Sequence, residues 1–301
     1  MTVPGPTACA TASTPRPSSS TRSSSSLDLF GFRRRRHERL AGEPTPDHWE
    51  SLIDENVPHV RMLSDGERER LYDLMQIFLG EKQFEGAGGF EVDDEVRLTI
   101  AAQACLLLLG QEGSAVYPRL KSVVVYPSPF VSRGETHNAD GTVDVGRQVR
   151  LGESWGAGTL VLAWDAVVGG AVGVGDGQNV VFHEFAHQLD SEETSSQGAP
   201  LLPERAMYRR WAAVLGEEYR QLIDDLENDE PTLLDAYGAT NAAEFFAVAT
   251  EFFFERPRQL KHRHGALYEQ LALFYKQDPA VRFGKDARAR AAERKAKRRR
   301  R

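Results

Sequence analysis

The sequence predicts an α+β fold in which a mixed sheet lies over a buried helix and a helical segment comes first. Three observations support this prediction. Helical periodicity dominates residues 46–110, short strand-like runs occur between 122 and 164, and helical patterns return from 180 to 276. With 301 residues, 41% of them hydrophobic, the chain can bury a sizeable core.

The first segment contains three predicted helices. One begins at residues 48–53, a second covers residues 65–79, and a third covers residues 93–109. In the second helix, apolar side chains recur every three or four positions, namely Leu71, Leu74, Met75 and Phe78. This spacing indicates a helix with one buried face.

Strand signals follow this segment. Residues 122–126 form an apolar run that ends at Pro127, and residues 159–164 form a second run; residues 148–151 alternate more weakly. The glycine-rich stretch 169–177 has no G-x-G-x-x-G between a strand and a helix. We therefore expect a loop there rather than a nucleotide-binding turn.

Residues 183–187 read His-Glu-Phe-Ala-His within the apolar stretch 179–190. Residues four apart lie on one face of a helix, so His183 and His187 can direct imidazole nitrogens at one Zn²⁺. Glu184 lies about 100° around the helix, where its carboxylate can take a proton from a zinc-activated water. We expect Asp176-Gly177 to cap this helix.

An alternative is a buried helix whose histidines are hydrogen-bonded core residues. Two histidines and a glutamate in an apolar helix cost free energy unless they have partners. The pattern therefore favours a zinc site, and its chemistry is that of a peptidase.

A catalytic zinc also needs a third protein ligand. The extension HExxHxxGxxH is absent, because Asp190 and Glu193 stand at its Gly and last His positions. Three further helices are predicted, at residues 203–226, 242–254 and 265–276. Glu244 lies on the first turn of the apolar helix 242–254, and a buried carboxylate there requires a partner.

Glu244 has a competing explanation. Asn241-Ala-Ala-Glu244 has the form of a capping box, in which Glu244 bonds only to the Asn241 amide, and the residues alone leave the two roles open. Asp235 is another carboxylate to consider. Glu251 shares the face of Glu244 but lies about two turns away, too far to bind the same ion.

The charge is unevenly distributed along the chain. Residues 1–40 have a net charge of +5 and residues 285–301 of +8, so that a total of −7 leaves −20 for residues 41–284. An acidic body repels phosphates, so we expect no specific nucleic-acid binding. We expect a disordered Ser/Arg-rich tail (1–40), a helical segment (41–115), a catalytic region (116–284) and a disordered basic tail (285–301).

The compartment is predicted from what the sequence lacks. Two cysteines, Cys9 and Cys105, suggest no disulfide framework, which is typical of a reducing compartment. The chain begins without an apolar leader, and no run approaches the ~18 apolar residues of a membrane span. We expect a cytoplasmic protein with no membrane contact.

Two blocks of the sequence, 180–190 and 235–247, resemble the Mlc titration factor A family of bacterial zinc peptidases and the catalytic domain of anthrax lethal factor. The likeness to the family extends to 123–127, 152–155 and 161–165. It implies a zincin-like metallopeptidase domain with aminopeptidase-like activity on peptide substrates. It also implies an alternative function, the sequestration of a sugar-responsive transcriptional repressor.

The resemblance also implies roles for individual residues. It makes Glu184 the general base and gives Tyr237 a hydroxyl that donates to the tetrahedral intermediate. It implies that Asp190 orients the ring of His187. The ligands that it implies for zinc are His183, His187 and Glu244.

Overall fold

The computed structural model describes residues 24–284, except 112, 114, 138–142, 151, 156–157, 174, 192–197 and 203. The described part of the chain divides into two units, with the boundary between Arg36 and His37. Helix α1 (Ser24–Ala41) covers residues for which the sequence predicted a disordered tail. Its leucine and arginine residues have high helix propensity, whereas the Ser/Arg-rich composition of residues 1–40 suggested disorder. The rest of the predicted tails, 1–23 and 285–301, lies outside the described residues.

The three predicted N-terminal helices are present, together with a short 3-10 helix and a short strand that were not predicted. In the second of the three helices, Ser64 and Glu67 form a capping box. A short strand, β1 (Gln83–Gly86), follows this helix and was not predicted, because only Phe84 of its residues is apolar. The helical elements are α2 (Asp47–Asn56), η1 (Pro58–Met62), α3 (Asp65–Glu81) and α4 (Asp94–Leu106).

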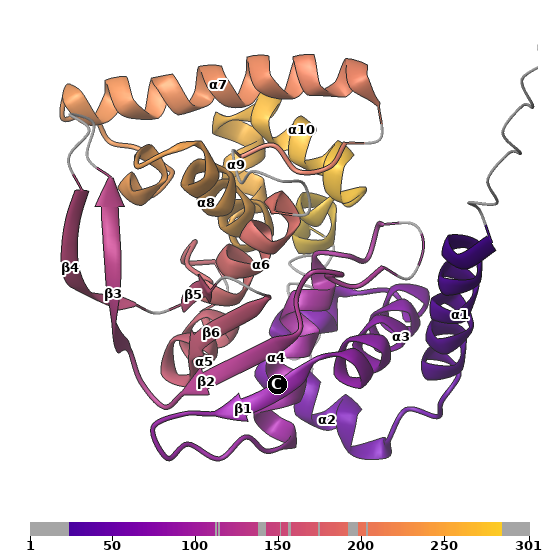
Figure 1. Cartoon of the computed structure of the whole chain (residues 1–301). Helices are drawn as coiled ribbons and strands as arrows, with labels where there is room; N and C mark the ends of the chain where they lie inside the picture. The colour runs from indigo at the N-terminus through magenta and orange to yellow at the C-terminus, as the bar shows by residue number, and fades with distance from the viewer. Residues whose placement is uncertain are drawn as a thin grey trace, which may run out of the picture. The chain divides into compact units, whose positions relative to one another are not determined.

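The sheet is mixed, as predicted. Strands β1, β2 (Ser122–Tyr126) and β6 (Thr159–Ala163) are parallel, and β5 (Gly152–Trp155) pairs antiparallel with β6. The strand order is β1-β2-β6-β5, so β5 lies at one edge (Figure 1). The central strands β2 and β6 carry the apolar side chains Val123, Val125, Leu160 and Leu162 into the core.

A separate antiparallel hairpin projects away from this sheet (Figure 1). It consists of β3 (Phe130–His137) and β4 (Val143–Arg150). The weak strand predicted at 148–151 falls mostly within β4. No strand was predicted at β3.

Helix α6 (Val180–Asp190), which carries the two histidines, lies between two layers. It contacts β5 and β6 on one side and α8 on the other (Figure 1). The predicted loop at 169–177 is partly helical instead, because Val167 and Ala171 pack into the core from one helix face. Further helices are α5 (Trp164–Val172), α7 (Arg205–Glu227), η2 (Ala236–Ala239), α8 (Ala242–Glu255), α9 (Pro257–Arg263) and α10 (Gly265–Tyr275).

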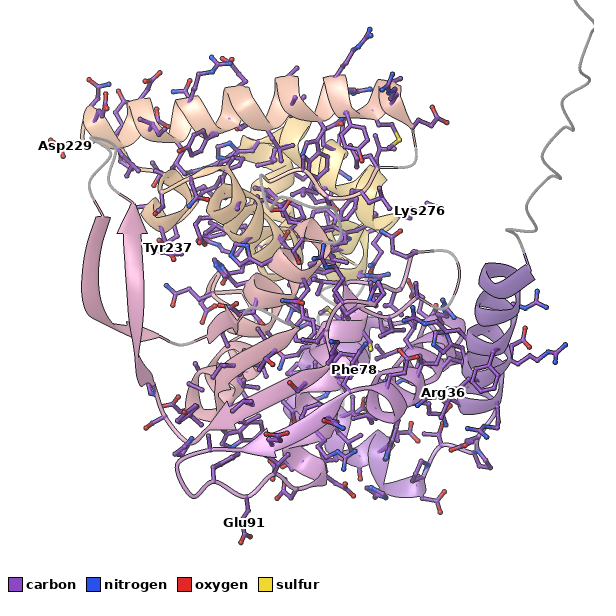
Figure 2. All side chains as sticks on the ribbon, viewed as in Figure 1. Arg36, Phe78, Glu91, Asp229, Tyr237 and Lys276 are labelled. Carbon is purple, nitrogen blue, oxygen red and sulfur yellow. The ribbon has the colours of Figure 1, made fainter. Side chains whose placement is uncertain are left out.

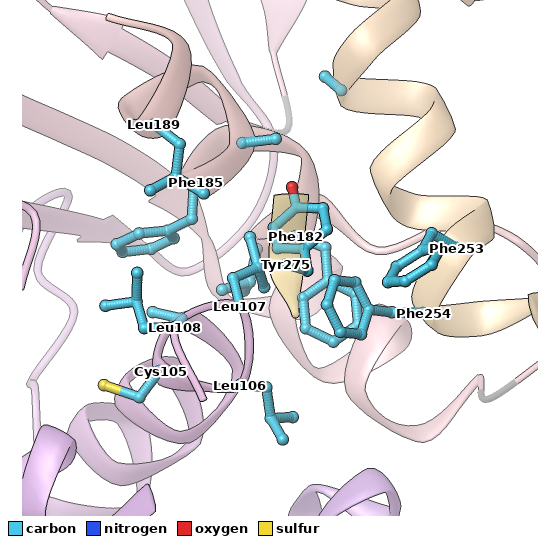
Figure 3. Packing of buried hydrophobic residues seen from close by; sticks show 14 of the residues in the cluster. Cys105, Leu106, Leu107, Leu108, Phe182, Phe185, Leu189, Phe253, Phe254 and Tyr275 are labelled. Atoms are coloured by element: carbon cyan, nitrogen blue, oxygen red, sulfur yellow. The ribbon is translucent and has the colours of Figure 1, made fainter. Parts of the chain in front are cut away.

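The core holds α6 firmly in place. Phe182 and Phe185 are fully buried, and their rings lie 5.2 Å from Phe254 and 4.7 Å from Tyr117, respectively. Figure 3 shows these α6 side chains beside the apolar end of α4 and the aromatic rings of α8 and α10. Each such side chain contributes roughly 1.5–3 kcal/mol through burial, so the helix is a rigid base for its polar residues. Within the described part of the chain, no helix combines the length and apolarity that a membrane span requires.

Candidate metal centre

The start of α6 is fixed by Asn179, not by the predicted cap Asp176-Gly177. The Asn179 side chain accepts a hydrogen bond from the Phe182 amide at 3.0 Å, as an N-cap residue does. Asp176 instead accepts from the Gln178 amide and shapes the turn before the helix. Asn179 is 1% exposed, so the cap is part of the interior.

Three potential metal ligands converge beside α6. Nε2 of His183 and Nε2 of His187 lie 3.2 Å apart, and Oε2 of Glu244 lies 3.0 Å and 3.2 Å from them. Among the residues described, these three form a group whose ligand atoms all lie within 4.8 Å of one another. A tetrahedral zinc with bonds near 2.0–2.1 Å keeps its ligand atoms about 3.3 Å apart, so this donor set fits the ion.

The side chain of Glu244 distinguishes between its two suggested roles. Asn241 caps α8 by accepting the amides of Ala243 and Glu244, which is one half of a capping box. The Glu244 carboxylate, however, points at the two histidines. Asp235 accepts the amide of Tyr237 at 2.8 Å and begins η2 instead. The structure therefore brings Glu244, and not Asp235, to the histidine pair.

The electrostatics of the cluster favour a positive charge between these groups. Burial lowers the pKa of His183, but hydrogen bonds to Glu244 and Glu251 outweigh it and raise the pKa to about 10. Burial raises the pKa of Glu244, but its bonds to the two histidines hold it well below the usual range. The carboxylates that favour a proton on His183 also favour a cation in its place.

Glu184 lies on a neighbouring face of α6 and packs against strand β5. It is 7% exposed. A Cβ atom built on Gly152 would lie only 2.6 Å from Cγ and Oε1 of Glu184, so the strand backbone passes directly over the carboxylate. Nothing in the sequence near residue 152 indicates this contact with Glu184, which lies 32 residues away.

Tyr237, on the short helix η2, lies near the candidate ligand His183. Its ring centroid is 5.8 Å from that of His183, and the residue is 45% exposed (Figure 2). The aromatic contact holds the ring beside the histidine, while its exposure leaves it accessible to a substrate. This position is compatible with the expected donor role.

The structure gives Asp190 other partners than the one expected. Its two carboxylate oxygens accept the backbone amides of Gly198 and Ala199 at 3.0 Å and 2.8 Å, so Asp190 anchors the chain that follows α6. The contact expected of it, a carboxylate on a ligand imidazole, is made on the other histidine by Glu251, with Oε1 2.7 Å from Nδ1 of His183. The sequence signal for Glu251 was its spacing of seven residues from Glu244, which places both glutamates on one face of the helix.

Comparison with known proteins agrees with this geometry. The model of the family described as glucose-regulated metallo-peptidase M90 matches residues 32–276. The chain belongs to the M90 family of metallopeptidases. This confirms the resemblance to the Mlc titration factor A family that the sequence indicated, and it makes the protein a metallopeptidase.

Several relatives match the M90 chain over most of its length. An uncharacterized protein of Synechocystis sp. is 45% identical over 82% of this chain and 90% of its own length. Mlc titration factor A of Enterobacter sp. is 32% identical over 82% of this chain and 93% of its own length. The factor of the same name from Escherichia fergusonii is 33% identical over 75% of this chain and 85% of its own length.

Proposed function

We propose that this M90 chain is a zinc-dependent, zincin-like peptidase in which His183, His187 and Glu244 hold the ion. The observation that carries the proposal is the convergence of three ligand atoms within 4.8 Å, with Glu184 on the adjacent helix face. When bound, zinc lowers the pKa of water and polarises the substrate carbonyl. The donor set of two imidazoles and one carboxylate suits this metal.

Glu184 is the general base in this proposal. Its carboxylate takes a proton from the attacking water and passes it to the leaving amine. Packing against Gly152 restricts the conformations of the Glu184 side chain, so the carboxylate keeps a fixed position for this proton transfer.

Strand β5 binds the substrate in this proposal. It is an edge strand, and an extended peptide can add to such an edge through main-chain hydrogen bonds. Because Gly152 of β5 touches Glu184, a peptide along this edge passes close to the base. Tyr237 then donates its hydroxyl to the oxyanion that develops on the carbonyl oxygen. We infer aminopeptidase-like activity on peptides in the cytoplasm.

A second function is supported by the relatives named Mlc titration factor A. We propose that the chain also binds a transcriptional repressor of the kind which that name indicates. Such binding depends on a protein surface and does not require hydrolysis. The two functions are therefore separable by experiment.

The variant Glu184→Gln tests both functions. Its amide is nearly isosteric but cannot accept a proton, so peptide hydrolysis should be lost while zinc content and thermal stability stay at wild-type levels. Repressor binding, measured with purified Mlc-type repressor, should persist. Normal turnover by zinc-loaded Glu184→Gln would show that another group is the base. Loss of repressor binding in this variant would contradict the proposed separation.

A further inference from the structure

The imidazole of His183 is held between two carboxylates of the same helix. Nε2 lies 3.0 Å from Oε2 of Glu244, and Nδ1 lies 2.7 Å from Oε1 of Glu251. The two glutamates are seven residues apart on α8, which places them on one face, two turns from each other. Helix α8 therefore contacts both nitrogens of this ring.

Glu251 is itself fixed from a second side. Its other oxygen, Oε2, accepts the backbone amide of Asn179 at 2.6 Å, and the residue is 8% exposed. Asn179 is the N-cap of α6, and its side-chain amide donates to Gln103, Gly170 and Glu255. The carboxylate thus keeps its place through contacts that do not involve His183.

We propose that Glu251 is a positioning residue for His183, which rests on the proposed role of His183 as a zinc ligand. A carboxylate at Nδ1 keeps the proton on that nitrogen and leaves the Nε2 lone pair directed at the metal. The same hydrogen bond stops rotation of the ring about its χ2 angle. Glu244 supplies a ligand and Glu251 orients one, so the site depends on how α8 is aligned with α6.

The test compares Glu251→Ala with the matched control Glu255→Ala. Both glutamates are buried, lie on α8 and contact Asn179, but only Glu251 touches His183. Zinc affinity, measured by competition with a chromogenic chelator, should fall by about 10–100-fold in Glu251→Ala. It should stay at the wild-type level in Glu255→Ala, even if that variant melts at a lower temperature.

Spectroscopy separates orientation of the ring from general loosening. The visible absorption of the Co²⁺-substituted protein should change in Glu251→Ala and not in Glu255→Ala. If Glu251→Ala does not fold, Glu251→Gln replaces it, because its amide keeps the volume and offers only one acceptor for two donors. In Glu251→Gln the imidazole ¹⁵N resonance of Nδ1 in the zinc-loaded protein should also shift.

Three results decide the outcome. Wild-type zinc affinity together with an unchanged cobalt spectrum in the Glu251 variant would overturn the inference. An equal loss of affinity in Glu255→Ala would also overturn it, because the effect would then be structural. Retention of zinc by His183→Ala would instead refute the proposed metal site itself, so failure of the two ideas is distinguishable.

Discussion

Adding one methyl group at Gly152 should impair catalysis without touching a metal ligand. The new Cβ of Gly152→Ala would lie 2.6 Å from Cγ and Oε1 and 2.8 Å from Cδ of Glu184, whereas real Cβ atoms essentially never approach closer than 3.0 Å. Gly152 does not adopt a positive φ, so the backbone accepts alanine and the contact is the whole perturbation. Either the carboxylate or strand β5 has to move.

The size of the effect follows from this distance. Ordinary van der Waals contact begins at 3.4 Å, so the Glu184 carboxylate has to retreat by roughly 1 Å. A misplacement of about 1 Å at a reacting group can cost on the order of 10²-fold in rate. We therefore expect kcat to fall about 10²-fold, or about 2.7 kcal/mol in activation free energy. Zinc content should remain at the wild-type level.

The assay is steady-state hydrolysis of a chromogenic peptide substrate by zinc-loaded enzyme, with metal content measured in parallel. Gly169→Ala is the control, because a Cβ there meets nothing within 4 Å and lies in helix α5. That control should keep wild-type kcat and become slightly more stable, since alanine favours a helix over glycine by roughly 1 kcal/mol. A Gly152→Ala enzyme with wild-type kcat would refute the reasoning that Glu184 acts from this position.

Three further predictions concern single side chains. Tyr237→Phe should lower kcat on the order of 10²-fold with unchanged zinc affinity. Normal turnover by this variant would show that the Tyr237 hydroxyl does not stabilise the oxyanion. Glu244→Ala should lose zinc on dialysis, as measured by atomic absorption, whereas Asp235→Ala should retain it; the reverse result would make Asp235 the ligand. Burial raises the pKa of Glu255 to about 8. The stabilisation that protonated Glu255 gives the folded state is therefore complete below pH 4.5 and is lost as the pH rises through 8. In Glu255→Gln the free energy of unfolding should lack that decline between pH 4.5 and 8. If urea denaturation gives the variant and the wild type identical pH profiles, the raised pKa of Glu255 is contradicted.

Local sequence determined the parts of the site that lie on one helix. The spacing of His183, Glu184 and His187 places two imidazoles on one face of α6 and the carboxylate beside them, whatever surrounds the helix. Apolar periodicity likewise predicted α3, α7 and α8 to within about two residues, because one turn of a helix contains its own signal.

Other elements have no local signal. Strand β1 is mostly exposed and polar, and it becomes a strand because the backbone of β2 offers it hydrogen bonds. The cap of α6 is Asn179 and not the predicted Asp176-Gly177, because Asn179 is buried among partners from α4, α5 and α8. Sequence pattern suggests which residues can cap a helix, but packing selects among them.

The contacts that complete the site were decided only by the tertiary structure. Glu244, Glu251 and Gly152 lie 61, 68 and 32 residues from the α6 side chains that they meet. Asp190 and Glu251 are both acidic residues on helices, yet Asp190 accepts the amides of Gly198 and Ala199 while Glu251 reaches the ring of His183. Helical spacing fixes directions within one helix, whereas the packing of α8 and β5 on α6 fixes which distant side chain lies in each direction.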